Sequence, residues 1–293
     1  MRHTSTQVRR VGDVVVVYRP DEEGTADLIA GVCEGAIRLA VTDWGLEPPE
    51  NCRIHVMTAP VRFVFESAPW PWRVLLVVSL PGWLPRVRRL WPYSAAWTQR
   101  YGRRVAIGVK PPRLVAQADR SIGARIYIEE PDPQVKVQHV ACHELVHACS
   151  ARLGLPMWLN EGLAMVSVDR YLGKPTISPA SLRLVREHAP KTAPPSYRTL
   201  SRLGAEAIAY QTVRGYWLVR YLEAVHSGVL KRAFAGHRNG LAVERAVLAE
   251  LGLAPADVWT SVDDLVTGYF SDTTGGGRGR APRDRDAAGG SAA

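Results

Sequence analysis

The chain has 293 residues, 46% of them hydrophobic, and carries a formal net charge of +9. This length and apolar content provide for a sizeable core and exclude a mainly disordered protein. Four cysteines, none in a CxxC pair, exclude a disulfide scaffold. The apolar runs are too short for a signal-peptide core or a membrane span, so we expect a cytoplasmic protein with reduced thiols.

The N-terminal half predicts a small sheet with a helix against it. One segment, residues 25–45, has apolar side chains at helical spacing and ends at Gly45. Ile126 and Ile128 alternate on one face of the last of four predicted strands. The predicted strands cover residues 14–18, 52–59, 103–113 (ending at two prolines) and 124–130.

From residue 135 onward the pattern is helical. The predicted helices cover residues 135–153, 160–172, 178–189, 205–225, 230–235, 243–251 and 256–270. The sequence therefore predicts an α+β fold, with an N-terminal α/β subdomain (1–134) that holds a small mixed sheet and a mainly helical subdomain (135–271). Residues 272–293 have almost no apolar content and predict a disordered tail.

Residues 143–147 read HELVH. On a helix, His143 and His147 lie one turn apart on one face and can direct both imidazoles at one metal ion. A Zn²⁺ ion held by two histidines and one carboxylate keeps an open position, where it lowers the pKa of bound water to about 7. Glu144, one step round the helix, is then placed to act as a general base toward that water.

The third ligand has to come from another segment. Glu161 is the best candidate, because it follows a short glycine-proline turn that lets the next helix pack back against the first. A third histidine at the spacing HExxHxxGxxH is excluded, since Ser150 and Leu153 occupy the last two marked positions. His139, one turn before His143, is an alternative ligand or a residue that supports one.

The sequence HELVH followed by LPMWLNEGLA (155–164) resembles the gluzincin zinc metallopeptidases, above all their compact peptidase MA-like domains. Their pattern is HExxH, a short connection and (P)xWxxEGxA, and here 13 residues separate His147 from Glu161. The resemblance implies a zincin-like zinc site between the two subdomains. It also implies His143, His147 and Glu161 as ligands and Glu144 as the general base.

The resemblance implies further site residues. In gluzincins a tyrosine early in a long helix donates a hydrogen bond to the oxyanion of the tetrahedral intermediate. The matching residue is Tyr210, with Tyr216 and Tyr221 as rivals. Many gluzincins also carry an acidic residue one or two turns after the ligand glutamate; here the first acidic residue is Asp169, which either orients a ligand histidine or is a solvated helix residue.

A substrate strand is implied as well. In gluzincins the edge strand beside the metal pairs with extended substrate. The strand expected in this role covers residues 124–130 and includes Ala124, Ile126 and Ile128.

Residues 69–113 depart from the family pattern and predict an insertion. They hold five of the nine tryptophans, together with many prolines and arginines. We expect a strand and a proline-bounded loop that covers the active-site cleft. Tryptophans beside arginines also suit a peripheral membrane contact through residues 70–97, whereas nucleic acid is not an expected partner.

The expected function is hydrolysis of a peptide or protein substrate by a zinc metallopeptidase. The alternative is a non-catalytic or membrane-associated zinc protein, in which the Trp/Arg-rich segment makes the binding contacts. Structural zinc sites are usually closed by four protein ligands, so a site with three ligands favours the enzyme.

Overall fold

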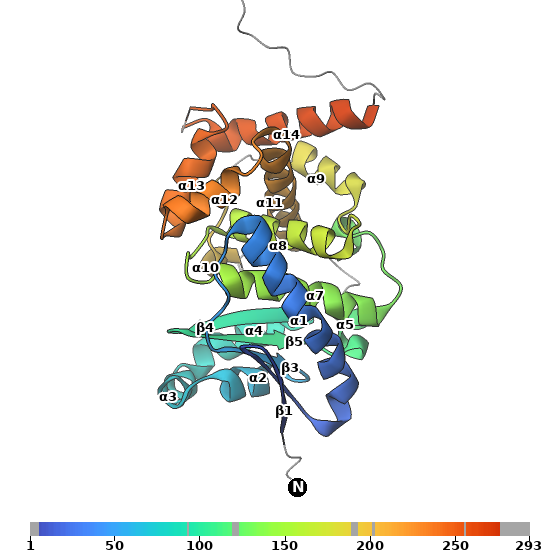
Figure 1. The fold of residues 1–293 in the computed structure, drawn as a ribbon, viewed down its shortest axis with the longest axis vertical. Helices are drawn as coiled ribbons and strands as arrows, with labels where there is room; N and C mark the ends of the chain where they lie inside the picture. Colours follow the sequence, from blue (N-terminus) through green and yellow to red (C-terminus); the bar gives the residue numbers. More distant parts are fainter. Residues whose placement is uncertain are drawn as a thin grey trace, which may run out of the picture.

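The computed structural model describes residues 6–92, 94–118, 123–188, 193–200, 203–254 and 256–275. The fold is α+β, as predicted, with one mixed five-stranded sheet and a larger helical part (Figure 1). The strand order is β1-β2-β3-β5-β4. The strands are β1 (Gln7–Val11), β2 (Val14–Tyr18), β3 (Cys52–Val56), β4 (Ala96–Tyr101) and β5 (Arg104–Val109).

Two hairpins flank a parallel centre in this sheet. β2, β3 and β5 run parallel, whereas β1 pairs with β2 and β4 pairs with β5 in antiparallel register. Each hairpin has a two-residue loop that begins with a glycine at positive φ, Gly12 at 55° and Gly102 at 63°. Glycine adopts this conformation without steric cost, and so it allows the tight turn.

Helices cover both faces of the sheet (Figure 1). Cys142 and Leu145 of α7 pack with α1 and the strands on one face, whereas Phe63 of α2 and Met57 pack on the other. Gly108 of β5 lies directly beneath Phe63 and Met57, where a Cβ atom would come within 2.9 Å of both side chains. The N-terminal helices are α1 (Glu23–Trp44), α2 (Pro60–Ser67), α3 (Trp70–Val78), α4 (Leu80–Leu90), α5 (Pro112–Ala118) and α6 (Gly123–Ile126), followed by α7 (Pro133–Ser150).

A second core holds the C-terminal helices together. It is centred on the crossing of α8 and α11, where two glycines bring the backbones into contact. A Cβ atom at Gly162 would lie 2.2 Å from the carbonyl oxygen of Gly215, and one at Gly215 would lie 2.2 Å from that of Trp158. The helices are α8 (Met157–Leu172), α9 (Leu182–Glu187), α10 (Tyr197–Leu200), α11 (Ala205–Val225), α12 (Val229–Gly236), α13 (Gly240–Ala249) and α14 (Val258–Gly275).

The strand predicted over residues 124–130 is wrong. Residues 123–126 form α6, and Tyr127 makes only an isolated bridge to Ile177, outside the sheet. The two isoleucines also do not share an environment: Ile126 is buried in the core of the C-terminal helices, whereas Ile128 is exposed. Burial of Ile126 against helices thus overrides the alternating pattern.

The segment 69–113, predicted as an insertion with a strand and a loop, contains α3, α4, β4 and β5. The strand predicted over residues 103–113 is confirmed as β5. The strand followed by a proline-bounded loop is wrong, because the residues before β5 form α3, α4 and β4. At the other end, α14 continues to Gly275, so the first residues of the predicted tail are helical; residues 276–293 lie outside the described part of the chain.

His55 of β3 makes the fold less stable at acidic pH. Its side chain is buried, and burial, with a smaller effect from the charges of Arg53 and Arg104, lowers its pKa to about 4. The unfolded chain, with a histidine pKa of about 6.5, therefore binds more protons between pH 6.5 and 4, and stability falls as the pH drops through that window. From pH 7 to pH 5 we expect His55 to contribute a loss of about 2 kcal/mol in the free energy of unfolding measured with urea.

The variant His55→Gln should lack this share of the pH dependence, whereas His237→Gln, at a partly exposed site, should keep it. Equal pH dependence in the wild type and His55→Gln would contradict the assignment.

Candidate metal centre

Helix α7 carries the two histidines and the glutamate of the HELVH sequence. The helix starts at a proline, and the side chain of Asp132 accepts a hydrogen bond from the Gln134 N–H at 2.8 Å, which caps its first turn. One turn of helix separates His143 from His147, and their ring centroids lie 4.5 Å apart with the rings nearly perpendicular. Both imidazoles therefore face the same point.

Helix α8 brings Glu161 to this point. The chain turns after α7 through Gly154, which has a φ of 61°, and α8 begins after Pro156. His143 Nε2 lies 3.4 Å from Glu161 Oε2, and His147 Nε2 lies 3.5 Å from Glu161 Oε1. One ligand atom from each residue falls within 4.8 Å of the others, so the group could hold a metal ion.

The electrostatics of the centre favour a positive charge. Burial alone would lower the pKa of His147, but the charge of Glu161, a hydrogen bond with it and the charge of Glu144 raise this pKa to about 9. Burial would raise the pKa of Glu161, yet the two histidines hold it well below its ordinary value. A proton or a metal cation at this centre is thus stabilised by the same carboxylates.

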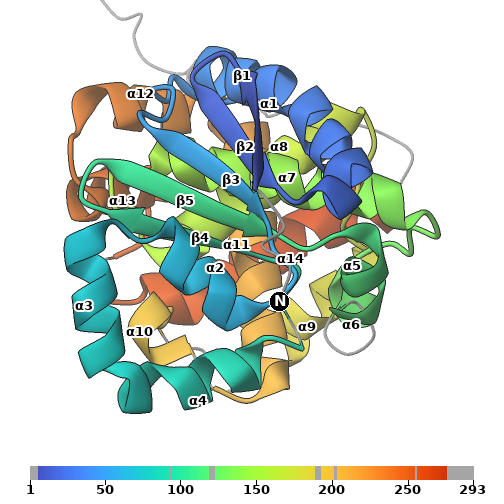
Figure 2. The ribbon, with the colours of Figure 1, turned by 90° about the horizontal axis from the view of Figure 1, so that it is seen from below.

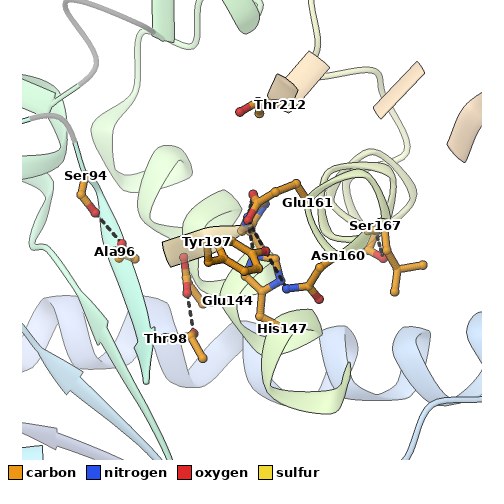
Figure 3. A network of polar contacts seen from close by, with 12 residues as sticks. Ser94, Ala96, Thr98, Glu144, His147, Asn160, Glu161, Ser167, Tyr197 and Thr212 are labelled. Atoms are coloured by element: carbon orange, nitrogen blue, oxygen red, sulfur yellow. Dashed lines mark hydrogen bonds and ion pairs between the residues drawn. The ribbon is translucent and has the colours of Figure 1, made fainter. Parts of the chain in front are cut away.

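Glu144 faces the sheet from the same turn of α7. It is buried, and its Oε2 accepts a hydrogen bond of 2.5 Å from Thr98 Oγ1 of β4 (Figure 3). Alternate residues of β4 point to this side: Arg100 donates to the backbone oxygen of Ala151 at the end of α7, at 2.8 Å. Strand β4, at the edge of the sheet, therefore lies beside the metal centre and fixes the carboxylate of Glu144.

A tyrosine that the sequence did not single out reaches the centre. Tyr197 of α10 donates a hydrogen bond to Glu161 Oε1 at 2.7 Å and accepts one from Asn160 Nδ2 at 2.8 Å (Figure 3). Asn160 is itself held by Ser150 Oγ, which donates to its Oδ1 at 2.7 Å. Burial of the hydroxyl and the charge of Glu161 raise the pKa of Tyr197 well above its ordinary value, so it remains a donor.

Tyr210, the tyrosine predicted to stabilise the oxyanion, contacts another helix. Its side chain is 1% exposed, and its hydroxyl donates to Asp263 Oδ2 of α14 at 2.6 Å. The ring stacks on His188 at 4.0 Å between centroids. With its hydroxyl bound to Asp263, Tyr210 joins α11 to α14 in this structure, and a catalytic Tyr210 stays a prediction.

The hydrogen bonds of Asp169 go to Thr176 and Tyr216, and not to a ligand histidine. Its Oδ1 accepts from the Thr176 N–H and hydroxyl, each at 2.7 Å, and its Oδ2 accepts from the Tyr216 hydroxyl at 2.7 Å. His139 is not part of the metal-binding group, and its buried Nε2 has no hydrogen-bond partner among the described residues. Because it accepts the hydrogen bond from Tyr216, Asp169 joins α8 to α11 instead of supporting the centre.

Comparison with known proteins adds no relative: no family model matches the chain, and no curated protein matches it significantly.

Proposed function

We propose that this protein is a zinc-dependent metallopeptidase. The observation that carries the proposal is the convergence of His143, His147 and Glu161 on one buried point, with Glu144 held beside it by an edge strand. The resemblance of these residues to the gluzincin pattern supports the same activity.

The donor set fits zinc. Two imidazole nitrogens and one carboxylate are ligands that catalytic zinc sites use, with bonds of about 2.0–2.2 Å. Tetrahedral ligands at that distance lie about 3.3–3.6 Å from each other. The Nε2 atoms of His143 and His147 lie 3.4 and 3.5 Å from the two carboxylate oxygens of Glu161, one from each oxygen, which is close to this spacing. Three protein ligands leave a fourth position for substrate or water.

When bound, zinc would polarise the scissile carbonyl and make a water acidic enough to attack it. Glu144 would accept the proton of the attacking water and pass it to the leaving amine. Thr98 holds this carboxylate in one orientation, so the base need not reorganise during the reaction.

An extended peptide fits the edge of the sheet. β4 is the last strand in the order and pairs only with β5 among the described residues. Its outer edge offers backbone donors and acceptors, which an extended peptide can pair with as an added strand. Because Thr98 of this strand contacts Glu144, a peptide bound there would pass the general base.

The Tyr197 hydroxyl donates to Glu161 Oε1 in this structure. Once a bound ion held that carboxylate, the hydroxyl would be free to donate a hydrogen bond to the substrate carbonyl oxygen as negative charge develops on it. The loss of one such donor costs about 10²–10³-fold in turnover, so we expect Tyr197→Phe to lower kcat about 10²-fold with metal content unchanged. Tyr210→Phe is the matched control: it removes a hydroxyl bound to Asp263, and we expect lower stability with kcat near the wild-type value. If Tyr210→Phe lowered kcat and Tyr197→Phe left it near the wild-type value, this assignment would be contradicted.

Metal removal tests the proposed function. The purified protein should contain one zinc ion per chain and cleave members of a peptide library. Chelation should abolish cleavage, and added zinc should restore it. Glu161→Ala should lose both metal and cleavage, whereas Glu187→Ala, at an exposed site in α9, should keep both. Cleavage that survives complete metal removal would refute the proposal.

A further inference from the structure

Helix α3 exposes a continuous apolar surface. None of its residues is buried, and its sequence, WPWRVLLVV, has a single charge. We call the exposed side chains the apolar face of α3; they are Trp70, Trp72, Val74, Leu75, Val77 and Val78. The exposed fractions reach 73% at Trp70 and 75% at Val78. Contiguous exposed apolar side chains of this kind mark an interaction surface.

The helix is held with this face outward. Leu76, on its inner side, packs against the cluster formed by Met57, Phe63 and Val64. Trp83 Nε1 of α4 donates to the backbone oxygen of Leu76 at 2.9 Å. At the start of the helix, Arg73 Nε donates to the backbone oxygen of Ala68 at 2.9 Å. Figure 2 shows α3 at the left periphery of the molecule, with the chain turning after it so that α4 lies along the lower periphery. These contacts hold the helix against α2 and α4. Of the apolar face, Trp72 also contacts Tyr101 of β4, edge to face at 5.7 Å between ring centroids, and it is the least exposed member at 43%.

The segment that contains α3 and α4 carries only positive charges. Residues 67–118 contain nine lysines and arginines and no aspartate or glutamate. Outside this segment the chain has 28 basic residues, the remainder of 37, against 28 acidic ones. The net charge of +9 therefore resides in this segment. Arg88 and Arg89 of α4 are exposed and form no ion pair among the described residues.

We propose that the apolar face of α3 and the arginines of α4 form a docking surface for an anionic lipid membrane. Aliphatic side chains flanked by tryptophans suit the boundary between headgroups and acyl chains, and adjacent arginines suit lipid phosphates. A second copy of the chain would bring a like-charged segment to the same face, so the charge favours lipid over self-association. Among the described residues no helix is both long and apolar enough to cross a bilayer, so the contact would be peripheral.

Vesicle co-sedimentation of the full chain tests this surface, independently of any peptidase activity. Vesicles of phosphatidylglycerol with phosphatidylcholine should bind the wild type, with less bound as salt increases, and vesicles of phosphatidylcholine alone should bind much less. The double variants Leu75→Ser/Val78→Ser and Arg88→Gln/Arg89→Gln should each bind the anionic vesicles at least about tenfold more weakly.

Two matched control variants distinguish the effect of this surface from the effect of lower apolarity or lower charge anywhere on the molecule. Val8→Ser/Leu241→Ser changes two exposed apolar residues elsewhere, and Arg183→Gln/Arg245→Gln removes two exposed charges elsewhere. Both should bind like the wild type, and all variants should share its thermal unfolding midpoint. Equal binding by the α3 variant and the controls, or no binding by the wild type, would overturn the proposal. A wild-type dimer on size exclusion that Leu75→Ser/Val78→Ser dissociates would assign the face to a second copy instead.

Discussion

Glu144→Gln should lower the turnover of peptide substrates by about 10²–10⁴-fold, the range expected for the loss of a general base. The amide is the same size as the carboxylate, and its oxygen can still accept the hydrogen bond that Thr98 donates. Fold and metal content should therefore remain, while the group that takes the proton is lost. Steady-state kinetics on a cleaved library peptide, with metal analysis of the same samples, measures both.

Glu187→Gln is the control for this substitution, because it makes the same change at an exposed position in α9. It should keep wild-type turnover. If Glu144→Gln retained full turnover with bound metal, Glu144 would not be the base. If it lost the metal as well, its carboxylate would belong to the binding of the ion.

Asp263→Ala should reduce the free energy of unfolding by about 3–5 kcal/mol, as expected when one partner of a buried ion pair is removed. Asp263 accepts from Arg214 Nε and from the Tyr210 hydroxyl, each at 2.6 Å, and both charged side chains are 1% exposed. Without the carboxylate, the guanidinium of Arg214 remains buried and loses the charge of Asp263, while Trp259 O still accepts from its Nη2 at 2.8 Å.

Urea unfolding at neutral pH measures this loss. The neighbouring residue provides the control: Asp264 is exposed, and Asp264→Ala should change stability by less than about 0.5 kcal/mol. Similar effects of the two substitutions would show that the buried pair is not a main contributor to stability.

The core of the metal centre could be predicted because its geometry is local. His143 and His147 are fixed relative to each other by one turn of helix, and a short turn limits where Glu161 can lie. The strands β2 and β5 were predicted for a similar reason, since their apolar runs are buried on both faces, whereas β3 was predicted from the alternation of its residues.

The rest of the centre depends on contacts between distant segments. Tyr197 lies in a four-residue helix, too short to show a helical period. Tyr210 lies in a long amphipathic helix, but no local feature shows that its hydroxyl bonds to Asp263, 53 residues later in the chain. β4 was missed because neither of its faces is apolar throughout: Ala96, Thr98 and Arg100 alternate with Trp97, Gln99 and Tyr101. Most of the strand is also only partly buried.

The crossing of α8 and α11 has a consequence for the affinity of the centre. Gly162 and Gly215 bring the two backbones together so closely that α8 has little freedom to rotate or slide, and Glu161 is the residue before Gly162. The entropy of assembling the three residues is thus lost when the chain folds, and it would not be lost again if an ion bound there. A preassembled centre of this kind retains more of its intrinsic binding free energy, since little is spent on ordering the protein.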